Sequence, residues 1–207
     1  MQTAVIAVLE PAVFFLGAAA LVTAVRWWRP ELPLRTGFSY VFLVAAFFSV
    51  PLFTGALQIP IDLAYRWLPW QDTVRARVVP ANDLLYDVLL EQLPFHTLVR
   101  RRLLDLEAPL WSNEIGAGQP LLANAQSAPF APLHLLALPL PPQRALTVSV
   151  AWEILLALLL MHALLQRLGA GRTGAAFGAI AAGFSSFTIP WAYHPHGMAV
   201  ALSLIHI

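Results

Sequence analysis

The sequence contains no cysteine and no lysine, and charged residues of every kind make up only 11% of its 207 residues. Without cysteine the chain has no thiol nucleophile, no disulfide and no cysteine-ligated zinc. All twelve basic residues are arginine and the net charge is +1, so there is no basic tail of the kind that binds nucleic acid. The start Met1-Gln2-Thr3 also lacks the basic residues of a signal peptide, and we expect the first hydrophobic segment to be retained.

Motifs of common soluble enzymes are absent as well. Gly116-Ala117-Gly118 is followed by Gln119-Pro120, so it does not open a helix as a dinucleotide-binding fingerprint does. Neither His-Glu-x-x-His nor Gly-x-Ser-x-Gly occurs in the sequence. What the chain has in excess is apolar residues, at 59%, where soluble domains have about 45–50%. This excess predicts surfaces that face lipid.

Four hydrophobic segments are long enough to cross a bilayer. They cover approximately residues 3–25, 37–59, 145–165 and 173–193. At a rise of about 1.5 Å per residue each spans roughly 30 Å, and backbone groups in lipid must be hydrogen-bonded within the segment, which requires helices. The sequence therefore predicts an all-α integral membrane protein with about four transmembrane helices and the start of a fifth at residues 199–207.

The short connections between these segments predict the orientation. Residues 26–35 contain three arginines, and Arg167 and Arg172 lie between the last two segments. Arginine in short loops stays on the cytoplasmic side. We therefore expect both short connections inside, and the long segment of about residues 60–144 outside.

The long segment predicts ordered structure, because a loop of this length is seldom structureless in a compact protein. Its middle, from Asn82 to about Leu106, reads as a helix that is broken or kinked at Pro94. Asn82 or Asp83 suits the N-cap of this helix, and the arginines at 100–102 suit its negative C-terminal end. Residues 133–138 are expected to form a short helix.

An acidic stripe is the clearest chemical feature. Asp83, Asp87 and Glu91 recur every four residues, which places all three on one face of a regular helix. Such a stripe fits a solvated face, a general base for proton abstraction, or a pair of carboxylates that holds a divalent cation.

Basic and histidine residues offer partners for an anion. The arginines at 100–102 suit either interfacial anchoring of the side chains or binding of a lipid-linked phosphate. His194 and His196 follow the last predicted span and could contact phosphate, ligate a metal, or simply lie at the membrane interface.

Two carboxylates fall inside predicted spans. A charged carboxylate at mid-helix costs about 2.5–3.5 kcal/mol on insertion scales, so Glu10 and Glu153 should face the bundle and be neutral or paired. In the last span Gly174 and Gly178, followed by Gly183, have the spacing that lets helices pack closely.

An ordered series of motifs between Pro80 and His196 resembles bacterial YfhO-like membrane proteins. The series includes Pro80-Ala81-Asn82-Asp83, Tyr86-Asp87, Pro109-Leu110-Trp111, Pro120-Leu121-Leu122-Ala123-Asn124, Gln126-Ser127 and Trp191-x-x-His194-Pro195-His196. That family belongs to the GT-C superfamily of polytopic glycosyltransferases, which take sugars from polyprenyl-phosphate carriers at the outer membrane face. The chain departs from the family pattern at Ser112-Asn113-Glu114, where Trp-Asn-Pro is usual.

The resemblance implies an essential aspartate in the first long outer loop. Asp87 matches that position best and Asp83 second, with a divalent metal between them as one option. It implies substrate contacts at Gln92, Arg100, Arg101, Trp111, Asn124, Gln126, His194 and His196. It also implies membrane lipid and a polyprenyl-phosphate-linked sugar as partners, and the bacterial inner membrane as the location.

These observations favour the N-terminal part of a membrane glycosyltransferase. Family members continue through further spans, and residues 202–207 resemble translated sequencing-adaptor sequence, so we expect a fragment that is inactive alone. The alternative is a non-catalytic protein that handles or transports lipid-linked polysaccharide, with Glu10, Glu153 and His162 along a polar path. A purely structural subunit would tolerate changes at Asp83 and Asp87.

Overall fold

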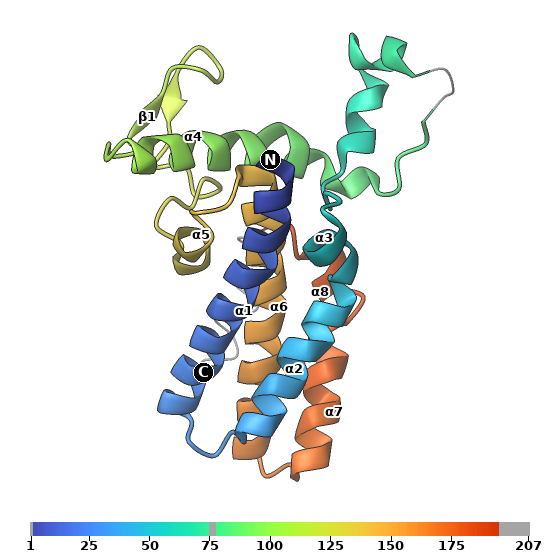
Figure 1. Ribbon diagram of the computed structural model, residues 1–207, viewed down its shortest axis with the longest axis vertical. Helices are drawn as coiled ribbons and strands as arrows, with labels where there is room; N and C mark the ends of the chain where they lie inside the picture. Colours follow the sequence, from blue (N-terminus) through green and yellow to red (C-terminus); the bar gives the residue numbers. More distant parts are fainter. Residues whose placement is uncertain (1, 75–77, 195–207) are drawn as a thin grey trace. The chain divides into compact units, whose positions relative to one another are not determined.

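The computed structural model describes the backbone of residues 2–74 and 78–194 (Figure 1). Regular structure in these ranges is helical apart from one pair of two-residue strands, so the all-α prediction is confirmed. The chain divides into two compact units. We call residues 1–56 with 147–207 the bundle unit, and residues 57–146 the loop unit. The loop unit coincides closely with the predicted outer loop, whereas the predicted start of a fifth span lies outside the described residues.

The bundle unit is built on two long helices, α1 (Gln2–Trp28) and α6 (Pro142–Arg167), the latter beginning in the loop unit. By length and composition, Leu9–Trp28 and Pro142–Arg167 are the two helices of the described chain that could cross a membrane. The remaining helices are α2 (Leu34–Phe47), α3 (Ser49–Thr54), α7 (Arg172–Gly183) and α8 (Thr188–Trp191). Two of the four predicted spans therefore appear as single long helices.

The second predicted span is divided into α2 and α3 at Phe48. Pro51 lacks the amide hydrogen that would bond to the carbonyl of Phe47, so the helical ladder loses one bond at this point. The amide of Leu52 still donates to the carbonyl of Phe48, which lets the helix resume. It ends at Gly55 in the left-handed conformation (φ 75°), four residues before the predicted end.

The fourth predicted span is interrupted between Gly183 and Thr188. Side-chain hydroxyls satisfy the freed backbone groups there: Ser185 accepts a hydrogen bond from the amide of Thr188, and the Thr188 hydroxyl donates to the carbonyl of Ala182. The break is thus internally hydrogen-bonded, which is what a helix needs if it is to be interrupted away from water.

Glycines allow the helices of the bundle unit to approach α6 closely. The ring of Trp152 on α6 is fully buried and occupies the space beside Gly17 of α1, and its Nε1 donates to the carbonyl of Phe14. On the α7 side, Gly178 lies against Leu165 and Gly183 against Leu158. The predicted small-residue packing is confirmed at these two glycines, whereas Gly174 has no heavy atom within 4 Å of a built Cβ.

Replacing Gly17 by alanine should destabilise the bundle unit. The new Cβ would lie 2.1 Å from Cζ2 of Trp152, and relieving such a contact in a packed core typically costs about 1–3 kcal/mol. Thermal unfolding in detergent measures the loss. The matched control is Gly174→Ala, which meets open space and should leave the midpoint unchanged or slightly raised. Equal midpoints for the two variants would contradict the Gly17–Trp152 contact.

The loop unit contains short helices and one small hairpin. Two 3₁₀ helices, η1 (Ile61–Arg66) and η2 (Trp70–Thr73), precede the segment that the sequence predicted as a single helix. That segment consists of η3 (Asp83–Leu85, 3₁₀), η4 (Val88–Gln92, π) and α4 (Leu93–Leu104). Strands β1 (Trp111–Ser112) and β2 (Gln119–Pro120) pair antiparallel, and α5 (Pro132–Leu136) confirms the predicted short helix.

Both ends of the predicted loop helix are confirmed within two residues. Asn82 is the N-cap, and its side-chain oxygen accepts a hydrogen bond of 2.9 Å from the amide of Leu84. At the other end Leu106 adopts φ 58°, and the amides of Leu106 and Glu107 donate to the carbonyls of Leu103 and Arg102. This is a Schellman ending, in which the left-handed position holds leucine in place of the usual glycine.

Candidate functional site

A π-helical turn lies at the centre of the predicted active segment. The amide of Leu93 donates to the carbonyl of Val88, five residues earlier. Pro94 has no amide hydrogen, and its ring would clash with the carbonyl of Leu90 in a regular helix, so the preceding turn is widened. The regular α-helix that the expected stripe assumed is thus replaced by a 3₁₀ turn at Asp83 and a π turn that contains Glu91. Asp87 is exposed, whereas Gln92 is buried.

The two predicted catalytic aspartates have different surroundings. Asp83 forms an ion pair with Arg66, 3.0 Å from nitrogen to oxygen, at the surface. A hydrogen bond to Tyr86 and the charge of Asp83 raise the pKa of Arg66. Asp87 is exposed and has no hydrogen bond or ion pair within the described residues. Of the two aspartates, Asp87 is thus the one without an ion pair among the described residues.

The described residues give limited support to a metal between these aspartates. They contain no group of three or more histidine, aspartate or glutamate side chains that could hold an ion. The guanidinium of Arg66 already neutralises Asp83, so a cation would compete with it for the same carboxylate.

Three of the predicted substrate contacts lie together. Gln92 ends the π turn, is fully buried, and its Nε2 donates to Oε1 of Gln126 at 3.4 Å. The amide of Gln126 in turn donates to Oδ1 of Asn124 at 2.9 Å, an Asx turn that fixes this loop. Oε1 of Gln92 is buried without a hydrogen-bond partner. This amide oxygen is free to accept a hydrogen bond from a ligand hydroxyl.

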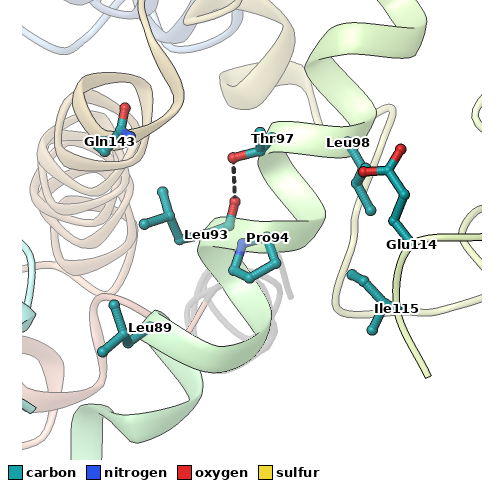
Figure 2. A pocket seen from close by; sticks show the side chains of 8 residues that line it. All are labelled: Leu89, Leu93, Pro94, Thr97, Leu98, Glu114, Ile115 and Gln143. Atoms are coloured by element: carbon teal, nitrogen blue, oxygen red, sulfur yellow. Dashed lines mark hydrogen bonds between the residues drawn. The ribbon is translucent and has the colours of Figure 1, made fainter. Parts of the chain in front are cut away.

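An open cleft of about 360 Å³ adjoins this segment. As Figure 2 shows, Leu89, Leu93, Pro94, Thr97 and Leu98 line it from the helical segment, Glu114 and Ile115 from the connection between β1 and β2, and Gln143 from the start of α6. Thr97 donates its hydroxyl hydrogen to the carbonyl of Leu93, so it adds no free donor to the cleft wall. The cleft is therefore mainly apolar, with Glu114 and Gln143 as polar groups at its edge.

The three consecutive arginines have three different partners. Arg100 donates from Nε to the carbonyl of Leu138 at 3.0 Å. Arg101 pairs with Glu114 and Arg102 with Glu107, both at the surface. The hydrogen bond and charge of Glu114 raise the pKa of Arg101. Within the described residues Arg100 donates from Nε alone and has no ion pair, which distinguishes it from Arg101 and Arg102.

The remaining predicted substrate contacts are Trp111, His194 and His196. Trp111 is 49% exposed, and its indole lies over Gly118 across the hairpin. His194 is buried in the bundle unit, with its ring 5.1 Å from that of Trp191. His196 lies outside the described residues. The structure thus brings Gln92, Gln126 and Asn124 together in the loop unit, whereas His194 belongs to the bundle unit.

A histidine pair connects α4 with α5 and was missed by the sequence analysis. The ring centroids of His96 and His134 lie 4.2 Å apart in an edge-to-face arrangement. Burial, reinforced by the neighbouring histidine, lowers the pKa of His96 to about 3. Burial also lowers the pKa of His134 to about 4, although a hydrogen bond to the backbone of Ala128 opposes this. Thirty-seven residues separate the two histidines in the chain, and no local pattern links them.

The histidine pair should make the loop unit acid-sensitive. Unfolded histidine titrates near pH 6.5, so below that pH the unfolded chain binds more protons than the folded one. Stability should be constant above about pH 6.5 and fall toward pH 4 by up to about 1.4 kcal/mol per pH unit for each histidine. Hydrogen exchange of the α4 and α5 amides measures this. In His96→Gln the loss of stability per pH unit should be smaller. An unchanged loss per pH unit would exclude the histidine pair as the cause of the acid sensitivity.

No family model, curated protein or solved structure matches the chain. The fold and site define a mostly helical protein with two helices that could cross a membrane. Its loop unit contains a buried glutamine pair and an exposed aspartate, Asp87, that has no ion pair among the described residues.

Proposed function

We propose that the chain is the N-terminal part of a membrane glycosyltransferase, which transfers a sugar from a polyprenyl-phosphate carrier to an acceptor at the outer membrane face. The observation that carries the proposal is the position of Asp87. It is exposed, lacks an ion pair within the described residues, and precedes Gln92 of the buried Gln92–Gln126 pair by five residues in the same helical segment. An exposed carboxylate without an ion pair is suited to accept the proton of a sugar hydroxyl.

The reaction follows from these groups. Asp87 takes the proton of an acceptor hydroxyl, whose oxygen attacks the anomeric carbon of the sugar. The bond from that carbon to the phosphate oxygen breaks, polyprenyl phosphate leaves with the electron pair, and the configuration is inverted. The terminal nitrogens of Arg100 would stabilise the phosphate as its charge develops. The apolar cleft beside α4 suits the isoprenoid units nearest the phosphate.

The proposal includes four membrane crossings. Besides α1 and α6, the pair α2–α3 covers residues 34–54 and the pair α7–α8 covers residues 172–191. Each pair is long enough to cross the hydrocarbon core, which is about 30 Å thick, despite its break. With the arginine-containing connections inside, the loop unit lies on the extracytoplasmic side of the bacterial inner membrane.

A transfer assay tests the function. The full gene product that contains these residues is reconstituted in liposomes with a panel of polyprenyl-phosphate-linked sugars and soluble or lipid acceptors. The expected result is release of polyprenyl phosphate together with a glycoside of inverted configuration. Absence of transfer across the panel, with the protein folded, would reject the enzymatic proposal.

The alternative is transport of lipid-linked polysaccharide, and it rests on the burial of Glu10, Glu153 and His162 in the bundle unit. However, His162 donates to or accepts from the Tyr40 hydroxyl at 2.7 Å, on the α2 side of α6. Nine residues separate it from Glu153, which is about 180° around a helix of 3.6 residues per turn. A single polar path through all three residues would have to cross α6, so we favour the enzymatic function.

A further inference from the structure

We propose that Trp67 and Tyr86 of the loop unit form a binding surface for a saccharide, whose hydroxyl Asp87 deprotonates. The acceptor in the proposed glycosyl transfer, on which this proposal rests, is then a sugar ring and not a simple alcohol, a lipid or a protein side chain.

Polar contacts hold η1 beside η3 in the loop unit. The carboxylate of Asp62 accepts a hydrogen bond of 2.7 Å from the amide of Ala81. The guanidinium of Arg66 lies 3.0 Å from a carboxylate oxygen of Asp83, and it is also hydrogen-bonded to Tyr86. These contacts come from both ends of η1, so they fix its position relative to η3.

An aromatic pair continues this contact toward Asp87. Trp67 directly follows η1, and the centroid of its ring lies 4.9 Å from that of Tyr86, with 70° between the ring planes. Tyr86 immediately precedes Asp87, and consecutive Cα atoms are about 3.8 Å apart. A ligand held by these two rings therefore lies beside the segment that carries the proposed base.

The arrangement of the two rings leaves aromatic surface for a ligand. In an edge-to-face pair one ring contributes its edge and the other a single face, so the remaining faces are not covered by the partner ring. Trp67 and Tyr86 are both partly exposed. The amide of Gln71 donates to the carbonyl of Trp67, so Trp70 lies on the same turn, and it is 52% exposed.

The mixture of aromatic rings and charged groups favours a saccharide over an acyl chain. One face of a sugar ring is lined by C–H bonds, and aromatic rings attract such weakly positive hydrogens because their own faces are negative. The Arg66–Asp83 pair, which adjoins Tyr86, has side chains that are 41% and 59% exposed. An acyl chain would strip water from these charges at a cost, whereas sugar hydroxyls can replace the water as hydrogen-bonding partners.

Saccharide binding is tested on the purified full chain, in a detergent without a sugar headgroup and without a lipid-linked donor. Saturation-transfer NMR is recorded with disaccharides of glucose and of N-acetylglucosamine, and with glycerol as a hydroxyl compound that has no ring. We expect saturation of the C–H protons on one face of a disaccharide and none of glycerol. Absence of saturation transfer from the folded chain to every disaccharide would overturn the proposal.

Variants at Trp67 separate stacking on a ring from general hydrophobic contact. Trp67→Phe keeps an aromatic ring, and its affinity should stay within a few-fold of the parent. Trp67→Leu keeps an apolar side chain without a ring, and its affinity should fall at least tenfold. Phe130→Leu is the matched control, because Phe130 is an aromatic residue of the same unit that is 57% exposed, and its affinity should be unchanged.

Thermal unfolding of each variant shows that the chain still folds. Equal affinities of Trp67→Leu and the parent would overturn the assignment, and this is the result expected of a surface that contacts lipid.

Binding and transfer can fail separately. Saccharide binding that depends on Trp67, without transfer from any donor, would reject the enzymatic proposal and retain the saccharide surface. Transfer to a non-saccharide acceptor by a chain that binds no disaccharide would do the reverse. Where both occur, Trp67→Leu should raise KM for the saccharide acceptor at least tenfold and leave KM for the donor within a few-fold.

Discussion

Changing Asp87 to asparagine is expected to slow sugar transfer by about 10²–10⁴-fold, the range typical for loss of a general base. Asparagine has nearly the same shape and cannot accept the proton of the acceptor hydroxyl, so binding of the carrier should change little. The loss should therefore appear in kcat much more than in KM for the polyprenyl-linked sugar. Steady-state transfer by the full gene product in liposomes measures both quantities.

The matched control is Asp83→Asn in the same segment. Asp83 is half-exposed and paired with Arg66 at the surface, where an ion pair contributes only about 0–1 kcal/mol. Turnover by this variant should remain within a few-fold of the parent. Full turnover in Asp87→Asn would remove Asp87 from the mechanism, and a large loss confined to Asp83→Asn would transfer the catalytic role to Asp83.

Local sequence signals were sufficient to predict where some helices begin or break. The N-cap was narrowed to Asn82 or Asp83, because both have a short side-chain acceptor before a helical run, and the structure has Asn82 in this role. The predicted outer loop of residues 60–144 covers nearly the same range as the compact loop unit of residues 57–146. The break at Phe48 was also accessible, because Pro51 removes a helical hydrogen bond whatever the surroundings.

The conformation of the segment from Asp83 to Leu104 was harder to predict from the sequence. The expected stripe assumed 3.6 residues per turn from Asp83 to Glu91, whereas a π turn precedes α4 and Pro94. A proline can be accommodated by a kink, a break or a widened turn, and the packing of Gln92 against Gln126, 34 residues away, accompanies the widened turn here. Propensity does not distinguish these outcomes.

Pairings between distant residues were beyond the sequence analysis. The arginines at 100–102 were weighed as a phosphate site or as membrane anchors, yet Arg101 and Arg102 pair with Glu114 and Glu107. These partners lie past the end of α4, and the Schellman turn at Leu106 brings Glu107 back toward Arg102. Within the described residues Arg100 is the one of the three arginines without an ion pair.

Cysteine labelling from one side of the membrane is expected to give an all-or-none result for the position of the loop unit. The chain has no cysteine, so each introduced cysteine is the sole target of a maleimide. Leu106 is 95% exposed in the loop unit, and Gly171 is exposed in the short connection before α7 with open space around it. In intact spheroplasts an impermeant maleimide should label Leu106→Cys fully, and should label Gly171→Cys only after the membrane is permeabilised.

A buried position serves as the control for this labelling. Leu155 on α6 is fully buried, and Leu155→Cys should resist the reagent until the chain is denatured. The expected pattern places Asp87, which shares the loop unit with Leu106, on the side where lipid-linked sugars are used by outer-face transferases. Protection of Leu106→Cys in intact spheroplasts would place Asp87 in the cytosol. The aspartate could then not reach a carrier in the outer leaflet, because a charged side chain and its backbone cannot cross the hydrocarbon core without large cost.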